Sequence, residues 1–333
     1  MAPPPIALLL LFLCPPTLIL AHPDCDDVVA DTSEPFTGVC TNKWKNVRQY
    51  VRPTQHDVGY AWVQKKTEKD FDSQTDAQDA IDGKIIPAVL GPNNVTGGYA
   101  YYVIDAHHTV AALDYSGYED THVKLTVLCD SRDMGYEDFL QKLSDYNLDY
   151  QLAHPSPDAQ SVKISTDQLP IKFSFTVDDK SFGDDRWRSI AGFSRKIKND
   201  ECTDYKYCMR CFIRGCNSAG KSVPFVEYKW SYFFVDALTD SSLWPSSNEY
   251  DEFKQKYESL PACVMGEIDT SAWEDAAKAI IPLCRGDAAG KYQLPTSLFK
   301  SGGGLPGYTE GKTQLPKDPD CEAPVCPYPQ FQN

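Results

Sequence analysis

The residues best suited to chemistry lie in one short segment, Asp105-Ala106-His107-His108-Thr109, between a predicted strand and a predicted helix. We expect Asp105 to cap the helix, with its carboxylate accepting the backbone N–H of His107 or His108. Both histidines would then lie in the first turn, where the helix dipole disfavours protonation and leaves a neutral imidazole available as a base or metal ligand. Successive helix residues point about 100° apart, so one histidine is expected to face a site and the other to brace it. The alternative is an ordinary helix cap with two hydrogen-bonded histidines.

A second polar segment, Arg52-Pro53-Thr54-Gln55, follows a predicted strand. Its proline fixes the backbone. The side chains of Arg52, Thr54 and Gln55 supply hydrogen bonds either to a polar ligand or to a neighbouring strand. We therefore treat these three as candidate ligand-binding residues, with a purely structural strand end as the alternative.

Three further candidates lie in predicted helices of the second half of the chain. Arg188 and Ser189 begin a helix and could hold an anion, although Arg188 could equally pair with a nearby acid. Glu227 lies on an otherwise apolar helix, and burying a carboxylate costs several kcal/mol unless it is paired. Two interpretations are open. Glu227 forms a structural ion pair with Arg188, or it orients His107 or His108 and assists as a general base.

These residues need a framework of strands and helices to bring them together. Hydrophobic patterns and turn residues predict an alternating α+β core over residues 45–150, with strands at 47–51, 85–90, 99–104 and 122–129 and helices at 57–70, 76–82, 106–115 and 136–147. Helical spacing then predicts a helical region over residues 151–300, with helices at 186–198, 225–238, 249–259 and 271–283. An irregular acidic leader, 22–44, precedes the core, and a Pro/Gly-rich tail, 301–333, ends the chain.

The composition restricts the partners of this chain. Its 333 residues are 42% hydrophobic and 12% aromatic, which is ample for a sizeable core. The 32 Lys and Arg residues against 47 Asp and Glu give a net charge of −15. Such a chain repels a phosphate backbone, and acids closely follow its densest basic run, 195–198. We therefore expect no strong nucleic-acid binding and look for a small-molecule ligand.

The N-terminal segment indicates secretion. Residues 1–21 contain no charged side chain and carry an apolar stretch that Pro15-Pro16 interrupts. We interpret this segment as a secretory signal peptide cleaved after Ala21. The double proline argues against a membrane anchor, and no other segment approaches the length of a membrane span. Asn94 begins an N-glycosylation sequon in a Gly/Asn-rich loop, with an unused sequon as the alternative.

The cysteine content points to the same compartment. Twelve cysteines are many for a reduced cytosolic protein of this size. We expect Cys25 and Cys40 to tie down the leader, and Cys129, in an apolar strand, to be the unpaired buried thiol. The densest group is expected to form disulfides, with a zinc knuckle as the alternative; its members are Cys202, Cys208, Cys211 and Cys216.

Several short motifs follow one another along the chain: Val51-Arg52-Pro53-Thr54-Gln55 with Gly59, Ile86-Pro87-Ala88-Val89-Leu90-Gly91, Asp105-Ala106-His107-His108, Trp187-Arg188-Ser189-Ile190-Ala191-Gly192, and Pro224-Phe225-Val226-Glu227-Tyr228-Lys229-Trp230. In this order they resemble the ParB-like nuclease family of the ParB/sulfiredoxin superfamily, over about residues 47–308. Residues 199–222, with their cysteines, look like an insertion into the family pattern, which suits a secreted member held by disulfides.

The resemblance implies an α/β core that binds a nucleotide at the turn between the strand and the histidine-bearing helix. His107 falls where sulfiredoxins have a nucleophilic cysteine, and His108 falls where they have a histidine, so the thiol chemistry of that group is not implied. Thr109 replaces an arginine that grips phosphate in relatives. Arg52 and Arg188 are the candidates to take over its role, and backbone N–H groups at the helix start could still hold an anion.

Two functions of different class follow. The first is a hydrolase or phosphotransferase acting on a nucleotide or other phosphate-bearing ligand, with a histidine of the pair as base and Asp105 orienting it. A divalent metal on Asp105 and a histidine also fits this function. The second is a non-catalytic, secreted ligand-binding or structural module on the same fold. In the first case we expect Asp105, His107 and His108 to line a concave pocket at the carboxyl end of strand 99–104.

Overall fold

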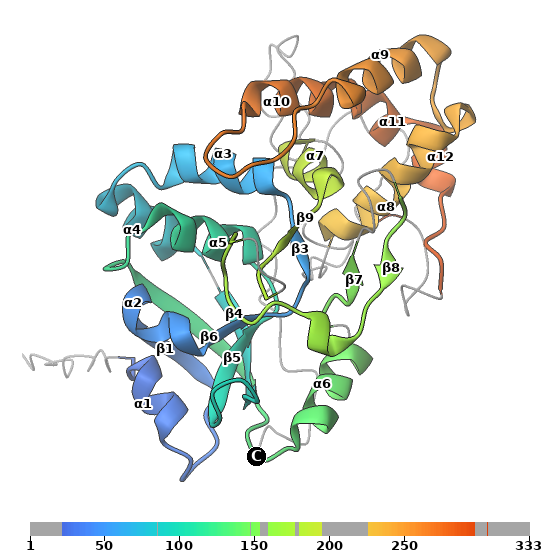
Figure 1. Cartoon of the computed structure of the whole chain (residues 1–333). Coiled ribbons are helices and arrows are strands. Elements are labelled where there is room, and N and C mark those ends of the chain that lie inside the picture. The colour runs from blue at the N-terminus through green and yellow to red at the C-terminus, as the bar shows by residue number, and fades with distance from the viewer. Residues whose placement is uncertain are drawn as a thin grey trace, which may run out of the picture.

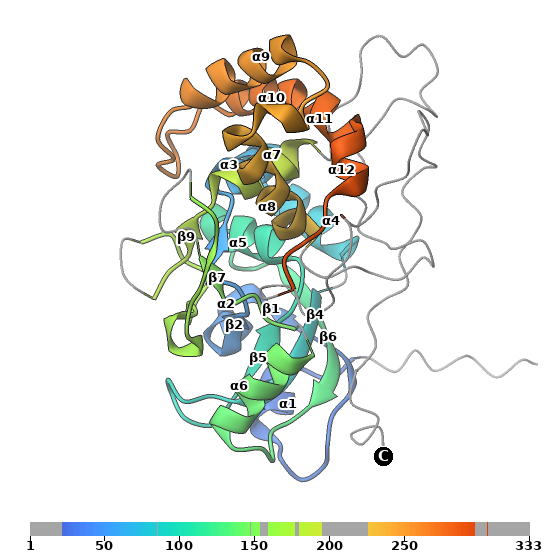
Figure 2. The same cartoon turned by 90° about the vertical axis from the view of Figure 1, so that its right-hand side faces the viewer.

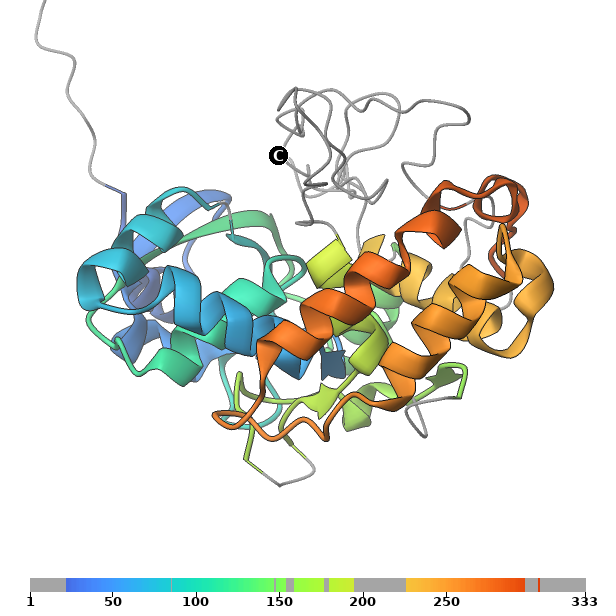
Figure 3. The same ribbon diagram turned by 90° about the horizontal axis from the view of Figure 1, so that it is seen from above.

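The computed structural model describes residues 22–84, 86–146, 148–153, 159–176, 180–194, 226–296 and 305. The predicted signal peptide, the cysteines of the 199–222 segment and nearly all of the predicted tail lie outside these residues. Within the described part, a half that contains the main sheet lies against a half built from helices (Figure 1), and the view from above shows the two halves side by side (Figure 3).

The main sheet has five strands, β1 (Gly38–Lys43), β2 (Val51–Pro53), β4 (Ile86–Pro92), β5 (Tyr99–Val103) and β6 (His122–Asp130). Their spatial order is β1-β6-β4-β5-β2. The sheet is mixed, because β4–β6 and β2–β5 are parallel pairs while β1–β6 and β4–β5 are antiparallel. This arrangement confirms the predicted α+β class. The predicted strand 47–51 is wrong, because a 3-10 helix occupies Arg48–Tyr50 and the strand begins only at Val51.

Both faces of the sheet are covered, because successive strand residues point to opposite sides. On one face, Val89 and Tyr102 pack against Phe139 of α6 (Tyr136–Asp145). On the other face, neighbouring strand residues such as Tyr101 and Val103 pack under helices at the sheet's far side, α3 (Tyr60–Asp70), α4 (Gln74–Asp82) and α5 (His107–Ser116). Figure 2 shows α6 on the side of the sheet away from α5.

The second half confirms the predicted helical region. Its helices are α7 (Arg186–Ser194), α8 (Val226–Thr239), α9 (Ser247–Glu258), α10 (Thr270–Ala279), α11 (Ile281–Arg285) and α12 (Asp287–Lys291). Their core is rich in fully buried aromatic rings, which include Trp187, Trp230, Phe233, Phe253 and Trp273. Helix α3 packs against α5 on one side and against α7 and α10 on the other, so it joins the two halves. The shorter elements are β3 (Asp57–Val58), β7 (Leu152–Ala153), β8 (Val162–Lys163), β9 (Gly183–Asp184), η2 (Thr166–Gln168) and η3 (Ser241–Leu243).

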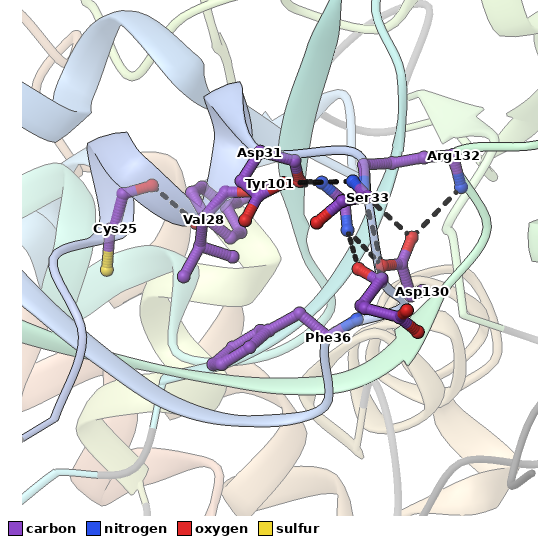
Figure 4. Close-up of polar contacts among 9 residues, drawn as sticks. Cys25, Val28, Asp31, Ser33, Phe36, Tyr101, Asp130 and Arg132 are labelled. Atoms are coloured by element: carbon purple, nitrogen blue, oxygen red, sulfur yellow. Dashed lines mark hydrogen bonds and ion pairs between the residues drawn. The ribbon is translucent and has the colours of Figure 1, made fainter.

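The sequence predicted an irregular acidic leader over residues 22–44, and this prediction is wrong. The segment forms α1 (Cys25–Ala30), β1 and the first residue of α2 (Trp44–Val47), and its Cys25–Cys40 disulfide is buried. The carboxylate of Asp130 and the guanidinium of Arg132 hold it from β6 (Figure 4). Arg132 donates to the Val28 carbonyl at 2.9 Å and to Asp130 at 2.6 Å. The segment is acidic but ordered, because a buried arginine donates hydrogen bonds to the carbonyls at the end of α1.

Two predictions about single residues concern this half, and the structure decides one of them. Cys129 is disulfide-bonded, so it is not the unpaired thiol that its apolar strand suggested. Asn94 is exposed in the turn between β4 and β5, which leaves its glycosylation a prediction. Among the described helices, none has the length and apolar character that a membrane span requires.

Candidate functional site

Helix α5 begins one residue later than the sequence analysis expected. Its N-cap is Ala106, which has a left-handed backbone with φ of 65°, and not Asp105. The Asp105 carboxylate accepts the backbone N–H of Ala106 at 2.7 Å, and the residue is exposed. The carboxylate therefore makes a local turn with the next residue, and the left-handed Ala106 carries the chain from that turn into the helix.

His107 is buried and holds the segment that follows β2. Its Nε2 accepts the backbone N–H of Thr54 at 3.1 Å, and its ring stacks on Phe173 with centroids 5.9 Å apart. Burial, and then the charge of Arg188, lower the pKa of His107 well below its ordinary value, while a hydrogen bond to the Val103 backbone opposes this. Because Nε2 accepts, Nδ1 carries the proton of the neutral ring. His107 is therefore a neutral imidazole with both ring nitrogens engaged by backbone groups.

His108 holds the other end of the same segment. Its Nε2 accepts the backbone N–H of Gly59 at 3.2 Å, and its Nδ1 lies 3.5 Å from Nη2 of Arg188. A neutral imidazole has only one acceptor nitrogen. The shorter contact assigns that role to Nε2, so the contact with Arg188 is an approach of two donors and not a hydrogen bond. His107 and His108 together therefore hold both ends of the 54–59 segment by hydrogen bonds.

Arg188 lies at the centre of this region and is 3% exposed. Its Nη1 donates to the Asp57 carbonyl at 2.8 Å, and its guanidinium carbon lies 3.8 Å from the ring centroid of Tyr228. Burial lowers the pKa of Arg188, but Tyr228, Glu227 and Asp185 together outweigh this and hold the pKa above its ordinary value. Glu227 therefore acts on Arg188 electrostatically, and the guanidinium stays charged inside the protein.

The other predicted ligand-binding residues on this segment are also buried. Arg52 donates from Nη1 to the Gln49 carbonyl at 2.7 Å. Thr54 donates from its hydroxyl to the Val103 carbonyl at 2.8 Å, and Gln55 donates from Nε2 to the Asp57 carbonyl at 3.1 Å. Each side chain thus has a structural contact with the backbone.

Ser189 and Thr109 occupy tightly packed positions next to the segment. The Ser189 hydroxyl accepts the backbone N–H of Trp62 at 3.3 Å. A Cβ on Gly59 would lie 2.4 Å from the Ser189 backbone nitrogen, so only glycine fits there. Thr109 is 6% exposed in the first turn of α5, and its N–H donates to the Ala106 carbonyl. Neither position is open to bulk solvent.

The structure therefore brings most of the predicted site together. Arg52 is not among the residues brought together, because it is in register with Tyr102 and lies with that residue on the α6 face of the sheet. We call the group Thr54, Gln55, His107, His108, Arg188 and Ser189 the motif cluster. It joins the segment after β2, the start of α5 and the start of α7, which are far apart in the sequence. Glu227, on α8, acts on the cluster through Arg188. Asp105 lies outside it on the surface.

A cleft of about 850 Å³ opens beside the same segment, and Asp105, His107 and His108 do not line it. It exposes residues that the sequence analysis missed, among them His56 and Cys263. The signal that could have found His56 is the His56-Asp57 pair directly after the Arg-Pro-Thr-Gln motif, since an adjacent carboxylate commonly orients an imidazole. Within the described residues, no group of three or more His, Cys, Asp or Glu side chains is arranged to hold a metal ion.

Comparison with known proteins identifies the family of this chain. The model of the family described as "Putative ParB-like nuclease" matches residues 48–236, more than half of the chain. The chain belongs to this ParB-like family. The matched residues include every member of the motif cluster of this ParB-like protein.

A solved structure also resembles this ParB-like chain, the protein Atu1540 from Agrobacterium tumefaciens. The two are 21% identical with a TM-score of 0.45, and the match covers 84% of this chain and 98% of that one. No curated protein matches the chain in sequence.

Proposed function

We propose that this ParB-like protein binds a nucleotide or another phosphate-bearing ligand at the motif cluster. One observation carries the proposal. The Nε atom of Arg188 is buried and has no hydrogen-bond partner among the described residues. An unsatisfied buried donor costs about 1–3 kcal/mol, and more when it is charged. Phosphate oxygens are the natural partners of a guanidinium, whose fork of donors matches them in pairs.

We propose that His107 and His108 do not act as catalytic bases on the bound ligand. A general base needs a ring nitrogen within reach of the proton that it abstracts. In His107 and His108, Nε2 already accepts a backbone N–H. The pair is thus suited to hold the 54–59 segment around a ligand, and the function that fits best is a ligand-binding module.

A hydrolase or phosphotransferase is the second candidate, and the charged Arg188 beside His107 favours it. Burial and Arg188 keep the pKa of His107 well below the ordinary value, so the ring is neutral, and it would act as a base only if the Thr54 contact opened. The charged Arg188 beside it would stabilise negative charge that develops on a phosphoryl group. A nucleotide would then be the substrate rather than only a ligand.

Secretion is part of the proposal. The buried Cys25–Cys40 disulfide and the disulfide-bonded Cys129 support an oxidising compartment. The apolar segment 1–21 supports the same route as a signal peptide. Expression of the full chain in secreting cells should release a protein that begins near His22. Retention of a reduced protein inside the cells would contradict secretion.

Binding is tested by titrating the purified protein with ATP, CTP and inorganic phosphate in a calorimeter. Arg188→Lys keeps the charge but removes Nε and the planar fork, so we expect affinity to fall about tenfold or more. Arg48→Lys is the matched control, because Arg48 is an exposed arginine paired with Glu119, and it should bind like the parent. Circular dichroism melts establish that both variants are folded. Absence of binding by the parent, or unchanged binding by a folded Arg188→Lys, would refute the proposal.

Turnover separates the two candidates. The parent protein, His107→Gln and His108→Gln are incubated with the same nucleotides and followed by phosphorus NMR. Binding without release of phosphate supports the ligand-binding module. Phosphate release that His107→Gln abolishes, in a variant that still binds, supports the enzyme.

A further inference from the structure

The cleft of about 850 Å³ is a second place where this chain could hold a ligand. Ligand pockets in proteins commonly span about 300–1,000 Å³. The cleft lies between the 54–59 segment, the segment around β9 and the turn before α10, and its lining includes His56, Tyr60, Phe175, Ser181 and Met265. It is separate from the motif cluster, since none of the cluster's residues lines it.

A buried carboxylate fixes the imidazole in this cleft. Nδ1 of His56 lies 2.5 Å from Oδ1 of Asp57, and the Asp57 side chain is 4% exposed against 27% for His56. Gly183 is required by this arrangement, because a Cβ there would lie 2.1 Å from Oδ1 of Asp57. The Asp57 carbonyl is held from behind by Arg188 and by the Tyr228 hydroxyl, which donates at 2.6 Å. The pair is therefore built into the fold from several elements.

With Nδ1 engaged, Nε2 is the ring nitrogen left for a ligand. Among the described residues it has no hydrogen-bond partner, and His56 is part of the cleft wall. This is the arrangement in which a carboxylate fixes the orientation of a histidine and leaves its other nitrogen to act. The hydrogen bond to Asp57 also raises the pKa of His56.

The other lining groups restrict the ligand. None of the residues described along the cleft is Lys or Arg, whereas Asp167 lines it and Asp57 lies directly behind His56. An anion would therefore meet carboxylates without a permanent cation to balance it. The hydroxyls of Ser181 and Thr176 and the amide of Gln168 offer both donors and acceptors. Such a wall suits hydroxyl groups, which also donate and accept.

Apolar groups supply the rest of the wall. Phe175 makes an edge-to-face contact with Tyr60 at 5.1 Å between centroids, which fixes its orientation. Val264 and Met265 add aliphatic surface. The Cys263 thiol also lines the cleft, but burial and Asp184 raise its pKa, so it remains protonated and is not a nucleophile. A ligand with a flat apolar face and hydroxyl edges matches this mixture, as a sugar ring does.

We infer that the cleft binds a small, uncharged, polyhydroxylated ligand of sugar type, with Nε2 of His56 as its central polar contact and Phe175 as its apolar platform. This inference is independent of the phosphate ligand proposed for the motif cluster. It also explains why Asp57 is buried beside an otherwise accessible histidine, since a fixed imidazole loses less freedom when it binds.

The test is NMR titration of the full secreted chain with methyl glucoside, cellobiose and glucose phosphate. We expect a neutral sugar to shift the imidazole signals of His56, which the His56→Gln variant identifies. His56→Gln and Phe175→Leu should each weaken sugar binding about tenfold. His122→Gln, which changes an exposed histidine on β6, should bind like the parent.

Three results would overturn the inference. The first is that neither neutral sugar shifts the His56 signals. The second is that glucose phosphate binds there at least as tightly as the neutral sugars, which would make it an anion site. The third is that sugar binding persists unchanged in both His56→Gln and Phe175→Leu. Each titration contains a single ligand, and nucleotide binding is measured in separate experiments, so the two proposals can fail separately.

Discussion

Replacing His107 with glutamine tests whether this buried histidine stabilises the fold as a neutral group. Its folded-state pKa lies well below its ordinary value of 6.5, mainly because of burial. In the unfolded chain the ring takes up a proton as the pH falls through about 6.5, whereas in the folded chain it does not. The unfolded state therefore binds more protons at low pH. The contribution of His107 to stability is complete above about pH 6.5 and is lost as the pH falls below it.

The magnitude follows from this difference of one proton. The slope approaches about 1.4 kcal/mol per pH unit, so the parent loses up to about 2 kcal/mol between pH 8 and pH 5 through this residue. His107→Gln cannot titrate, although its amide can still accept the Thr54 N–H. At pH 8 we expect the variant to be about 1–3 kcal/mol less stable, because the ring's packing on Phe173 and its hydrogen bonds are disturbed. By pH 5 that gap should shrink by up to about 2 kcal/mol.

Urea unfolding at pH 5, 6, 7 and 8, with disulfides intact, measures both quantities. His122→Gln is the control, because His122 is exposed, and its effect should stay within about 0.5 kcal/mol at every pH. The reasoning is refuted if the gap between the parent and His107→Gln is the same at pH 5 and pH 8.

Three more changes have defined outcomes. Gly183→Ala places a Cβ 2.1 Å from Oδ1 of Asp57 and should lower stability by about 1–3 kcal/mol in a thermal melt, whereas Gly135→Ala, with its nearest contact at 3.6 Å, should have little effect. Cys25→Ser with Cys40→Ser opens a disulfide that links residues 15 apart and should cost about 3 kcal/mol in urea; an unchanged midpoint would show that the bridge does not constrain the chain. Arg132→Met leaves Asp130 charged and buried and should cost about 3–5 kcal/mol, and the further change Asp130→Asn should recover part of this loss.

The elements could be predicted from the sequence where local periodicity decides them. The helical spacing of 249–259 and the alternation in 122–129 reappear as α9 and β6, with ends that differ by at most two residues. These segments bury one face against partners that any compact fold would supply. The strand predicted at 47–51 was wrong because so short a segment, with Arg48 and Gln49 between apolar residues, fits a helical turn as well as a strand.

The order of segment 22–44 could not be predicted, since it depends on residues far along the chain. Arg132 and Asp130 hold it from the end of β6, and their effect on carbonyls near residue 31 is invisible in local composition. An acidic stretch is usually solvated, and here a distant arginine and a disulfide make it part of the core. The prediction for Cys129 was wrong for the same reason, because the apolar pattern of a strand does not indicate whether a second cysteine lies opposite.

In the candidate site, too, part of the arrangement could be predicted from local sequence and part depends on distant contacts. The motifs indicated that Arg52, His107, His108 and Arg188 belong together. The fold brings the last three together but places Arg52 on the α6 face of the sheet. The atoms they use were not predictable, because whether Nε2 meets a ligand or a backbone N–H depends on the path of the 54–59 segment. That path is set by contacts with α5 and α7.

The 54–59 segment connects the two proposed sites through a single residue. It has little regular structure, so side chains from distant helices satisfy its backbone groups: His107 and His108 accept its N–H groups, and Arg188 and Tyr228 donate to the Asp57 carbonyl. The Asp57 side chain, on the opposite side of the same residue, fixes His56 in the cleft. Nε of Arg188, which the proposed phosphate would engage, belongs to the same guanidinium as the Nη1 that donates to the Asp57 carbonyl. A ligand that displaced Asp57 would reorient His56, and any such coupling between the two sites would be reciprocal. The two sites therefore share Asp57 as the residue through which binding at one would alter binding at the other.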